Sequence, residues 1–197
     1  MKKILFASNN QGKIREVVKI LSNLGIKIMT PDQVFNKKID VIEDGTTFEE
    51  NAYKKAKEMG DKSNLITIAD DSGLEVDELK GEPGVYSARY DETTEKRNQK
   101  VLNNLASAPK ERRIARYKIA ICIYDPQTKN HETVFGSCEG IITQKPVGDN
   151  GFGYDPIFYS EELGKTFGQA SDLEKNKISH RKIALEKLKN ILPTYIK

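Results

Sequence analysis

Two adjacent carboxylates, Asp70 and Asp71, have the clearest potential for chemistry in this sequence. They directly follow the unbroken apolar run LITIA (65–69), which is typical of a central strand covered on both faces. Because ligands of open α/β sheets gather at the carboxyl ends of strands, carboxylates at this point can bind Mg²⁺ and activate a water molecule. The alternative is an Asx turn, in which one Asp bonds a nearby backbone N–H. Two consecutive acids favour the functional interpretation.

A second acidic group lies upstream, within residues 43–50. A Mg²⁺ site that is completed by a phosphorylated ligand needs only one or two protein carboxylates. Glu50 forms with Thr47 the T-x-x-E pattern of a helix capping box, which gives Glu50 a structural role. Glu43, which follows a possible short strand over 39–43, is therefore the metal candidate of this group.

Residues 8–13 (SNNQGK) combine polar side chains with a lysine, between an apolar segment and a segment with helical spacing. The N-terminus of a helix offers free N–H groups and the positive end of its dipole, so anions bind there readily. The Asn side chains and Lys13 would add donors for a phosphate. The segment is neither a Walker A loop nor G-x-G-x-x-G, and an Asn-rich turn with a solvated lysine explains it equally well.

Glycines stand beside aromatic residues in GFGYDP (151–156). This composition suits a loop that lets a flat ring approach the backbone and stack, and base–aromatic stacking contributes about 1–3 kcal/mol. In the alternative interpretation, Phe152 and Tyr154 fill the core while Gly and Pro shape a turn.

Basic and polar side chains gather in KNKISHR (175–181). Within the single helix expected here, Lys175 and Ser179 fall at neighbouring positions, so several donors point one way. The alternative is a solvated helix face. A serine hydrolase is not indicated because there is no G-x-S-x-G motif. Zinc is not indicated because His131 and His180 are far apart in the sequence.

The periodicity of apolar residues indicates an α/β fold that positions these segments. A strand–helix–strand pattern opens the chain, and a hairpin with the turn DPQTKN follows later. Capping boxes at Thr47 and Ser171 mark the starts of two helices, the second of which is expected to run unbroken to Pro193. No repeat or linker divides the sequence, so one domain over 1–197 is expected. Strands are predicted at 3–8, 26–30, 39–43, 65–69, 114–124 and 132–143, and helices at 11–24, from 47 to about 60, at 94–106 and from 171 to 193.

The composition describes a folded, nearly neutral chain. Its 197 residues suffice for one sizeable core, and 37% hydrophobic with 31% charged residues argue against disorder. The net charge of +3 gives no case for a nucleic-acid or membrane partner, and no apolar run approaches the roughly 20 residues of a membrane span. The N-terminus is typical of a first strand rather than a signal peptide, so a cytoplasmic location is expected. Cys122 and Cys138 are then expected to be core thiols, with a disulfide as the alternative.

Five segments, taken together and in this order, resemble the inosine triphosphate pyrophosphatase family. They are SNNQGK (8–13), TFEENAYKKA (47–56), IADDSGLEVDELKGEPGVYSARY (68–90), GFGYDPIF (151–158) and EKNKISHRKIAL (174–185), which span essentially the whole chain. The resemblance implies an elongated α/β protein with a strongly twisted mixed sheet flanked by helices, two lobes with a central cleft, and a homodimer. It also implies Mg²⁺-dependent hydrolysis of ITP, dITP or XTP to the nucleoside monophosphate and pyrophosphate.

The resemblance further implies roles for individual residues. Asp71 matches the catalytic carboxylate, and Glu43 and Asp71 match the metal ligands. Three positions depart from the family pattern: Asn9 replaces a glycine, Val147 replaces a common Arg, and Gln169 stands where an acid is common. The residues that match substrate contacts are Ser8, Asn9, Asn10, Gln11, Gly12 and Lys13 at the phosphates, Ser72 beside the catalytic carboxylate, Phe152, Gly153, Tyr154 and Asp155 in the base-binding loop, and Lys175, His180 and Arg181 near the C-terminus.

These roles define a mechanism without a covalent nucleophile. Asp71, or Asp70 beside it, would take a proton from the attacking water. Selectivity would rest on the 6-oxo group of hypoxanthine and xanthine, an acceptor that fixed donors such as those of Arg181 recognise and that the 6-amino group of adenine cannot replace. The competing interpretations are a Maf-like nucleotide pyrophosphatase acting on other bases and a catalytically silent nucleotide-binding protein.

Overall fold

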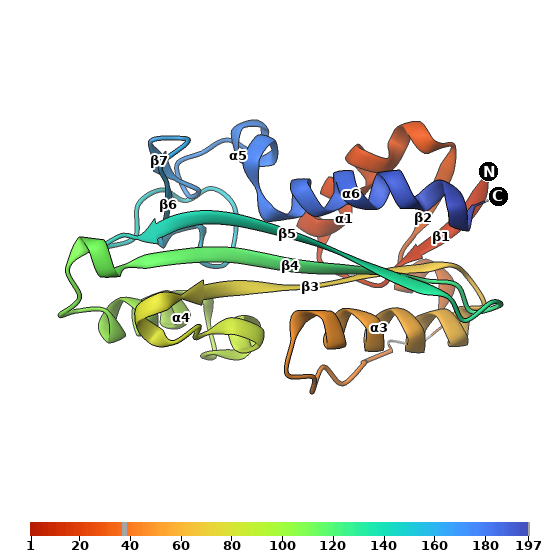
Figure 1. The fold of residues 1–197 in the computed structure, drawn as a ribbon, viewed down its shortest axis with the longest axis horizontal. Coiled ribbons are helices and arrows are strands. Elements are labelled where there is room, and N and C mark those ends of the chain that lie inside the picture. The colour runs from red at the N-terminus through yellow and green to blue at the C-terminus, as the bar shows by residue number, and fades with distance from the viewer. Residues whose placement is uncertain (37–38, 197) are drawn as a thin grey trace. The chain divides into compact units, whose positions relative to one another are not determined.

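Seven strands form one mixed sheet in the computed structural model, which describes residues 1–36 and 39–196 (Figure 1). β1 pairs in parallel with both β2 and β3, whereas β6 pairs antiparallel with β5 and with β7. The sheet is open, and the expected α/β class is confirmed. In the sheet order β2-β1-β3-β4-β5-β6-β7, the strands are Ile26–Met29, Lys2–Phe6, Thr67–Val76, Ile114–Tyr124, His131–Ile142, Phe158–Ser160 and Lys165–Thr166.

The chain forms two compact units. Unit 1 contains Met1–Asp71, Ile119–Gly136 and Arg181–Lys197, and unit 2 contains Ser72–Lys118 and Ser137–His180. β3, β4 and β5 each contribute residues to both units. The boundary in β3 falls directly after Asp71, so each unit is described by itself below.

Helices cover both faces of the strands in unit 1. α1 (Gln11–Leu21) and α6 (His180–Tyr195) lie on one face, and α3 (Phe48–Ser63) lies on the other (Figure 1). Because side chains alternate along a strand, Ile4 packs into the core under α1 and α6, while Leu5 packs into the core under α3. The strand is therefore apolar at consecutive positions. A short helix that was not predicted, α2 (Pro31–Val34), follows β2 and is capped by Thr30.

Unit 2 has a core of its own. α4 (Thr94–Asn104) supplies Val101 and Leu102, and the aromatic side chains of Tyr117, Phe158 and Phe167 pack with them. α5 (Asp172–Ile178) begins at the predicted capping box, in which Ser171 and Glu174 bond each other's backbone N–H groups. Among the described residues, no helix of either unit is long and apolar enough to cross a membrane.

Most predicted elements lie close to their predicted places. Gly25 ends the first helical segment in the left-handed conformation (φ 64°), as expected for a residue at that position. Thr47 caps α3 by accepting from the Glu50 N–H, although the Glu50 carboxylate bonds Thr46 instead of completing the box. Cys122 and Cys138 are buried free thiols, which confirms that prediction.

Three predictions about elements are wrong. Residues 39–43 form no strand. β3 does not end at residue 69 but runs on to Val76, because its neighbours in the sheet override the weak strand propensity of Asp, Ser and Gly. The helix that begins after Ser171 breaks at Ser179, whose extended backbone (ψ 150°) separates α5 from α6, and Pro193 lies inside α6 rather than at its end.

Candidate active site

Asp70 and Asp71 are consecutive inside β3, so their side chains leave opposite faces of the strand. Asp70 shares its face with Ile68, which packs in the core under α1 and α6. Asp71 shares its face with Ala69, which packs under α3. The two carboxylates therefore have different neighbours and different electrostatics.

Asp70 belongs to a buried group of four charges in unit 1. Its Oδ2 lies 2.8 Å from Lys13 Nζ and 3.6 Å from Arg181 Nη2. Arg181 Nη1 in turn donates to Glu16 Oε2 at 2.9 Å. Burial raises the pKa of Asp70, but Lys13 and Arg181 together lower it more, so it lies well below its ordinary value. Asp70 is therefore an ionised partner of two cations and a poor proton acceptor.

Asp71 is 9% exposed, and its Oδ2 accepts a hydrogen bond from Asn51 Nδ2 at 2.9 Å. Burial is the largest influence and raises the pKa of the Asp71 carboxyl, and Glu43 raises it further. The Asn51 hydrogen bond and the charge of Lys55 oppose this shift without cancelling it. Of the two aspartates, Asp71 is thus the one suited to accept a proton near neutral pH.

Glu43 lies just before α3 and forms an ion pair with Lys55 of that helix. Both side chains line a pocket of about 190 Å³ in unit 1, together with Ser8 and Asn9. The pocket thus joins the polar segment at residues 8–13 to the acidic segment before α3. A cation, a carboxylate and small polar groups in one pocket suit a phosphate and its counter-ion.

The segment 8–13 has a capping role as well. Asn10 Oδ1 accepts from the Lys13 N–H at 3.2 Å, and the Asn10 N–H donates to Ser8 Oγ at the same distance. Gln11 and Gly12 form the first turn of α1. The Asn-rich turn is therefore real, but Lys13 is not a solvated lysine because it pairs with the buried Asp70.

Glu43 and Asp71 form a donor set that fits Mg²⁺. Among the described residues, no group of three or more His, Cys, Asp and Glu side chains is placed to hold a metal ion by itself. Mg²⁺ in nucleotide sites needs fewer, since it keeps several waters and takes further oxygens from the substrate phosphates. Glu43 is close enough to Asp71 to raise its pKa, so two carboxylate donors lie in one neighbourhood.

In unit 2, Asp155 organises the loop that contains Phe152. Asp155 Oδ2 accepts from the Phe152 N–H at 2.8 Å and from Lys175 Nζ at 2.5 Å, while Oδ1 accepts from the Tyr117 hydroxyl at 3.2 Å. A Cβ on Gly151 would lie 2.1 Å from Asp155 Oδ2, so this close approach of loop and carboxylate requires glycine. The loop is consequently held in one conformation by a buried charge pair.

The two aromatic residues of this loop differ in exposure. Phe152 is 43% exposed, and Lys175 Nζ lies 4.5 Å from the centroid of its ring. Tyr154 is 4% exposed, and its hydroxyl donates to the Ser87 carbonyl at 2.9 Å. Between them, Gly153 adopts a left-handed φ of 63°. The core-filling interpretation is correct for Tyr154, whereas the exposed Phe152 is placed to stack on a flat ring.

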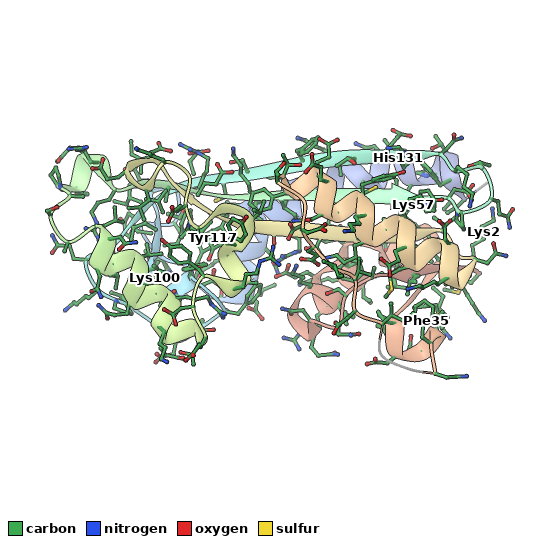
Figure 2. All side chains as sticks on the ribbon, turned by 90° about the horizontal axis from the view of Figure 1, so that it is seen from below. Lys2, Phe35, Lys57, Lys100, Tyr117 and His131 are labelled. Carbon is green, nitrogen blue, oxygen red and sulfur yellow. The ribbon has the colours of Figure 1, made fainter. Side chains whose placement is uncertain are left out.

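The basic segment near the C-terminus is buried rather than solvated. Lys175, Ser179 and His180 are each at most 5% exposed, and the His180 ring stacks on Tyr117 with centroids 4.8 Å apart and planes within 9° (Tyr117 is labelled in Figure 2). The interpretation as a solvated helix face is therefore wrong for these residues. Ser72, the first residue of unit 2, is half-buried in β3.

Val147 and Gln169, the two departures from the family pattern near this loop, make local hydrogen bonds. The Val147 N–H donates to the Pro156 carbonyl at 2.9 Å, and Gln169 Oε1 accepts from the Thr166 N–H at 3.2 Å. Each residue is thus integrated without a charged partner of its own.

Sequence reasoning missed four residues of these clusters: Glu16, Asn51, Lys55 and Tyr117. Asn51 is fully buried and lies within the apolar stripe of α3, beside Ala52. A polar residue inside an apolar helical stripe is a pattern that could have identified it. Lys55 lies about one helical turn further on. Glu16 and Tyr117 look like ordinary surface and core residues in the sequence, so no pattern distinguishes them.

Comparison with known proteins gives a consistent result over nearly the whole chain. A model of the Ham1 family matches residues 4–191. The dITP/XTP pyrophosphatase of Bacillus licheniformis is 46% identical over 198 residues, which cover 98% of either chain. That of Leuconostoc mesenteroides is 43% identical over 199 residues, covering 99% of this chain and 98% of the relative. These names do not favour the Maf-like alternative.

Solved structures show the same fold. The Ham1 protein of Staphylococcus aureus is 40% identical with a TM-score of 0.88, and the alignment covers 98% of this chain and 100% of that one. A HAM1 protein from Coxiella burnetii is 38% identical with a TM-score of 0.90 at the same coverage. The mixed sheet and its flanking helices are therefore those of a known fold.

Proposed function

We propose, because this chain belongs to the Ham1 family, that it hydrolyses non-canonical purine nucleoside triphosphates such as dITP, XTP and ITP to the nucleoside monophosphate and pyrophosphate. This reaction removes such nucleotides from the nucleotide pool. The observation that carries the proposal is the contrast between the two adjacent aspartates. Asp70 is held ionised by two cations, whereas burial and Glu43 raise the pKa of Asp71.

Asp71 is the proposed catalytic residue. A carboxylate with a raised pKa accepts a proton from water more readily than one whose pKa is lowered, and so it generates the attacking oxygen. Phosphoryl transfer otherwise depends on positioning and on neutralising negative charge. In unit 1, Lys55 and the segment 8–13 supply donors for phosphate oxygens. Lys13 is a second cation for the phosphates, provided that it can leave Asp70.

Mg²⁺ is the proposed cofactor, with Glu43 and Asp71 as its protein ligands. When bound, it neutralises phosphate charge and lowers the pKa of a coordinated water. Lys55 now occupies the Glu43 carboxylate as an ion pair, so Lys55 is the group that must move toward the phosphates when the carboxylate takes up a metal. The chain's own contribution is to hold two carboxylates and one lysine together in a buried environment.

Base recognition is proposed for unit 2 and for the start of α6. Phe152 offers an exposed ring for stacking, and the Asp155–Lys175 pair and His180 offer polar groups from one buried cluster. Arg181 is the proposed donor to the 6-oxo group, which would reject the 6-amino group of adenine by setting donor against donor. Its guanidinium has five N–H donors, of which the contacts to Glu16 and Asp70 engage two nitrogens.

The remaining proposals concern assembly and location. We propose that units 1 and 2 are the two lobes of one catalytic domain over residues 1–197. A homodimer is proposed from the resemblance to the family, and a cytoplasmic location from the sequence of the N-terminus together with the free thiols. Gel filtration with light scattering measures the first, and fractionation of cells measures the second.

Product analysis on a panel of triphosphates, with and without Mg²⁺, tests the proposed reaction. ITP, dITP and XTP should each give the monophosphate and pyrophosphate, and EDTA should abolish the reaction. In ¹⁸O-labelled water, the label should appear in the nucleoside monophosphate, because water attacks the α-phosphorus. A diphosphate with orthophosphate, or label found only in pyrophosphate, would contradict the proposed cleavage.

A further inference from the structure

Asn51 is fully buried in α3, and its side-chain amide bonds two different segments of unit 1. Its Nδ2 donates to Asp71 Oδ2 at 2.9 Å, and its Oδ1 accepts from the Gly45 N–H at 2.8 Å. The planar amide combines donor and acceptor in one rigid group, which neither an aspartate nor a leucine of similar size can do. One side chain thus connects β3 to the loop before α3.

The loop approaches Asn51 so closely that only glycine fits at position 45. A Cβ there would lie 2.7 Å from Asn51 Oδ1 and 2.8 Å from Glu50 Cβ. Gly45 is two residues after Glu43, so the hydrogen bond holds the backbone of the segment that carries the Glu43 carboxylate. Both proposed carboxylates are therefore tied to the same amide.

We propose that Asn51 is a positioning residue that sets the distance and orientation of the Asp71 carboxylate relative to the Glu43 segment. The two hydrogen bonds act as one clasp, because the amide cannot turn toward one partner without leaving the other. This inference rests on the proposed function, since it assigns Asn51 to the reaction through Glu43 and Asp71. The clasp itself exists independently of which substrate is hydrolysed.

A purely structural role for Asn51 accounts for less of the arrangement. The α3 helix already has Thr47 as its N-cap, so the helix start does not need a second side chain at the loop. At the surrounding buried positions α3 uses Ala52 and Ala56, which pack without any polar group to satisfy. A buried amide that reaches one carboxylate and the segment of another is what a site with two carboxylate ligands requires.

Two substitutions break the clasp from its two ends, and a third serves as a control. Asn51→Leu removes both hydrogen bonds at nearly constant volume. Gly45→Ala leaves every site side chain in place and forces the loop away from Asn51. Thr47→Ala removes the cap of the same helix, and so destabilises α3 without contacting Asp71. For each variant we would measure kcat, KM for ITP, the Mg²⁺ concentration for half-maximal rate, Tm, and hydrogen exchange of the amide at residue 45.

The expected result is a kcat that falls roughly 10- to 100-fold in Asn51→Leu and Gly45→Ala, as for other residues that orient metal ligands. KM for ITP should change much less, because neither residue contacts the base loop of unit 2. The Mg²⁺ requirement should rise, and the amide at residue 45 should exchange faster in the unliganded chain. Thr47→Ala should lower Tm yet leave kcat and the Mg²⁺ requirement close to those of the parent chain.

Three outcomes would overturn the inference. They are a kcat and Mg²⁺ requirement of Asn51→Leu close to the parent values, an unchanged exchange rate at residue 45, or a loss of kcat in Thr47→Ala as large as in Asn51→Leu. Failure of the proposed function is a different result, because the parent chain itself would then release no pyrophosphate from ITP. The exchange measurement uses the unliganded chain, so it tests the clasp in that case as well.

Discussion

Lys13 Nζ lies 2.8 Å from Asp70 Oδ2, so the lysine of the first polar segment neutralises the first of the two adjacent aspartates. Arg181 approaches the same oxygen from α6, and both cations keep Asp70 ionised. Asp71 lies on the other face of β3, where burial raises its pKa. One aspartate is consequently bound to structural charge, and the other is left for chemistry.

Asp71→Asn should lower kcat for ITP by about 10²–10⁴-fold, the usual contribution of a general base. The amide keeps the shape of the side chain but cannot accept the proton and is a weaker metal ligand. The Tm should stay close to that of the parent chain. Steady-state kinetics with added Mg²⁺, together with thermal unfolding, measure both effects. Near-normal turnover in a folded variant would remove Asp71 from the catalytic role.

Asp70→Asn should act mainly on stability. Removing this charge leaves Lys13 and Arg181 in a buried environment with Glu16 as their remaining carboxylate. Breaking a buried charge group in this way costs about 3–5 kcal/mol. Urea unfolding should show this loss in the free energy of unfolding, and a variant as stable as the parent chain would refute the buried network.

Arg181→Ala should erode base discrimination more than Lys13→Ala does. If Arg181 donates to the 6-oxo group, the ratio of kcat/KM for ITP to that for ATP should fall by roughly ten- to a hundred-fold, since each such contact contributes about 1–3 kcal/mol. Lys13 should act on phosphates that all substrates share, so its loss should slow ITP and ATP alike.

Kinetics with both nucleotides in both variants separate these roles. An equal effect of Arg181→Ala on ITP and ATP would assign Arg181 to the phosphates or to the Asp70–Glu16 network alone. Base selection would then rest on the cluster around Phe152 and Asp155 in unit 2.

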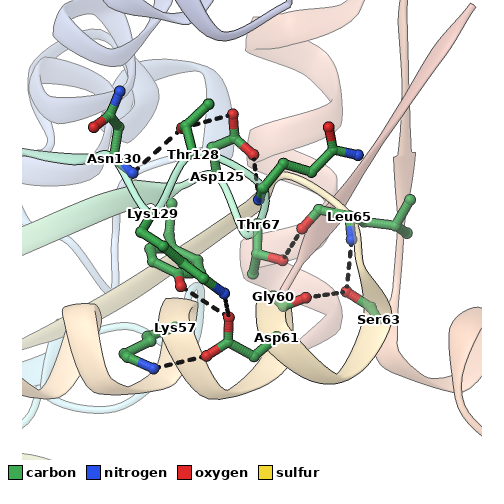
Figure 3. A network of polar contacts seen from close by, with 12 residues as sticks. Lys57, Gly60, Asp61, Ser63, Leu65, Thr67, Asp125, Thr128, Lys129 and Asn130 are labelled. Atoms are coloured by element: carbon green, nitrogen blue, oxygen red, sulfur yellow. Dashed lines mark hydrogen bonds and ion pairs between the residues drawn. The ribbon is translucent and has the colours of Figure 1, made fainter.

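Asp61 fastens the β4–β5 turn to the end of α3, and its contribution should depend on pH. Its carboxylate accepts from Lys57 and Lys129 (Figure 3) and from the Tyr124 hydroxyl, and these hydrogen bonds lower its pKa well below 3.8. A lowered folded-state pKa stabilises the fold above the unfolded-state value, and this stabilisation is lost as the pH falls further. Asp61→Asn should therefore lower Tm by about 2–4 °C at pH 7.

The Tm difference between Asp61→Asn and the parent chain should shrink as the pH falls below about 4, where the carboxyl begins to take up a proton. Thermal unfolding from pH 7 to the lowest pH at which the chain folds measures this change. A difference that is constant over this range would show that the ionised carboxylate does not carry the effect.

The sequence by itself determined the fold class, most elements and the segments of the site. Apolar periodicity located β1, α1, β4 and β5, since strands and helices repeat with different periods. The polar segments at 8–13, 70–71, 151–156 and 175–181 stood out because their composition departs from that periodicity. Local propensity could not predict that β3 continues through Asp70 to Val76 or that the chain turns at Ser179, because pairing and packing with distant segments decide both.

Only the tertiary structure decided how the charged residues are partnered. In the sequence, Asp70 and Asp71 are equivalent neighbours, and either one could take the proton. The alternation of side chains in β3 turns them to opposite faces, one toward Lys13 and the other toward Asn51. Burial and neighbouring charge then shift their pKa values in opposite directions. Such shifts depend on distances between residues far apart in the chain, which no local pattern contains.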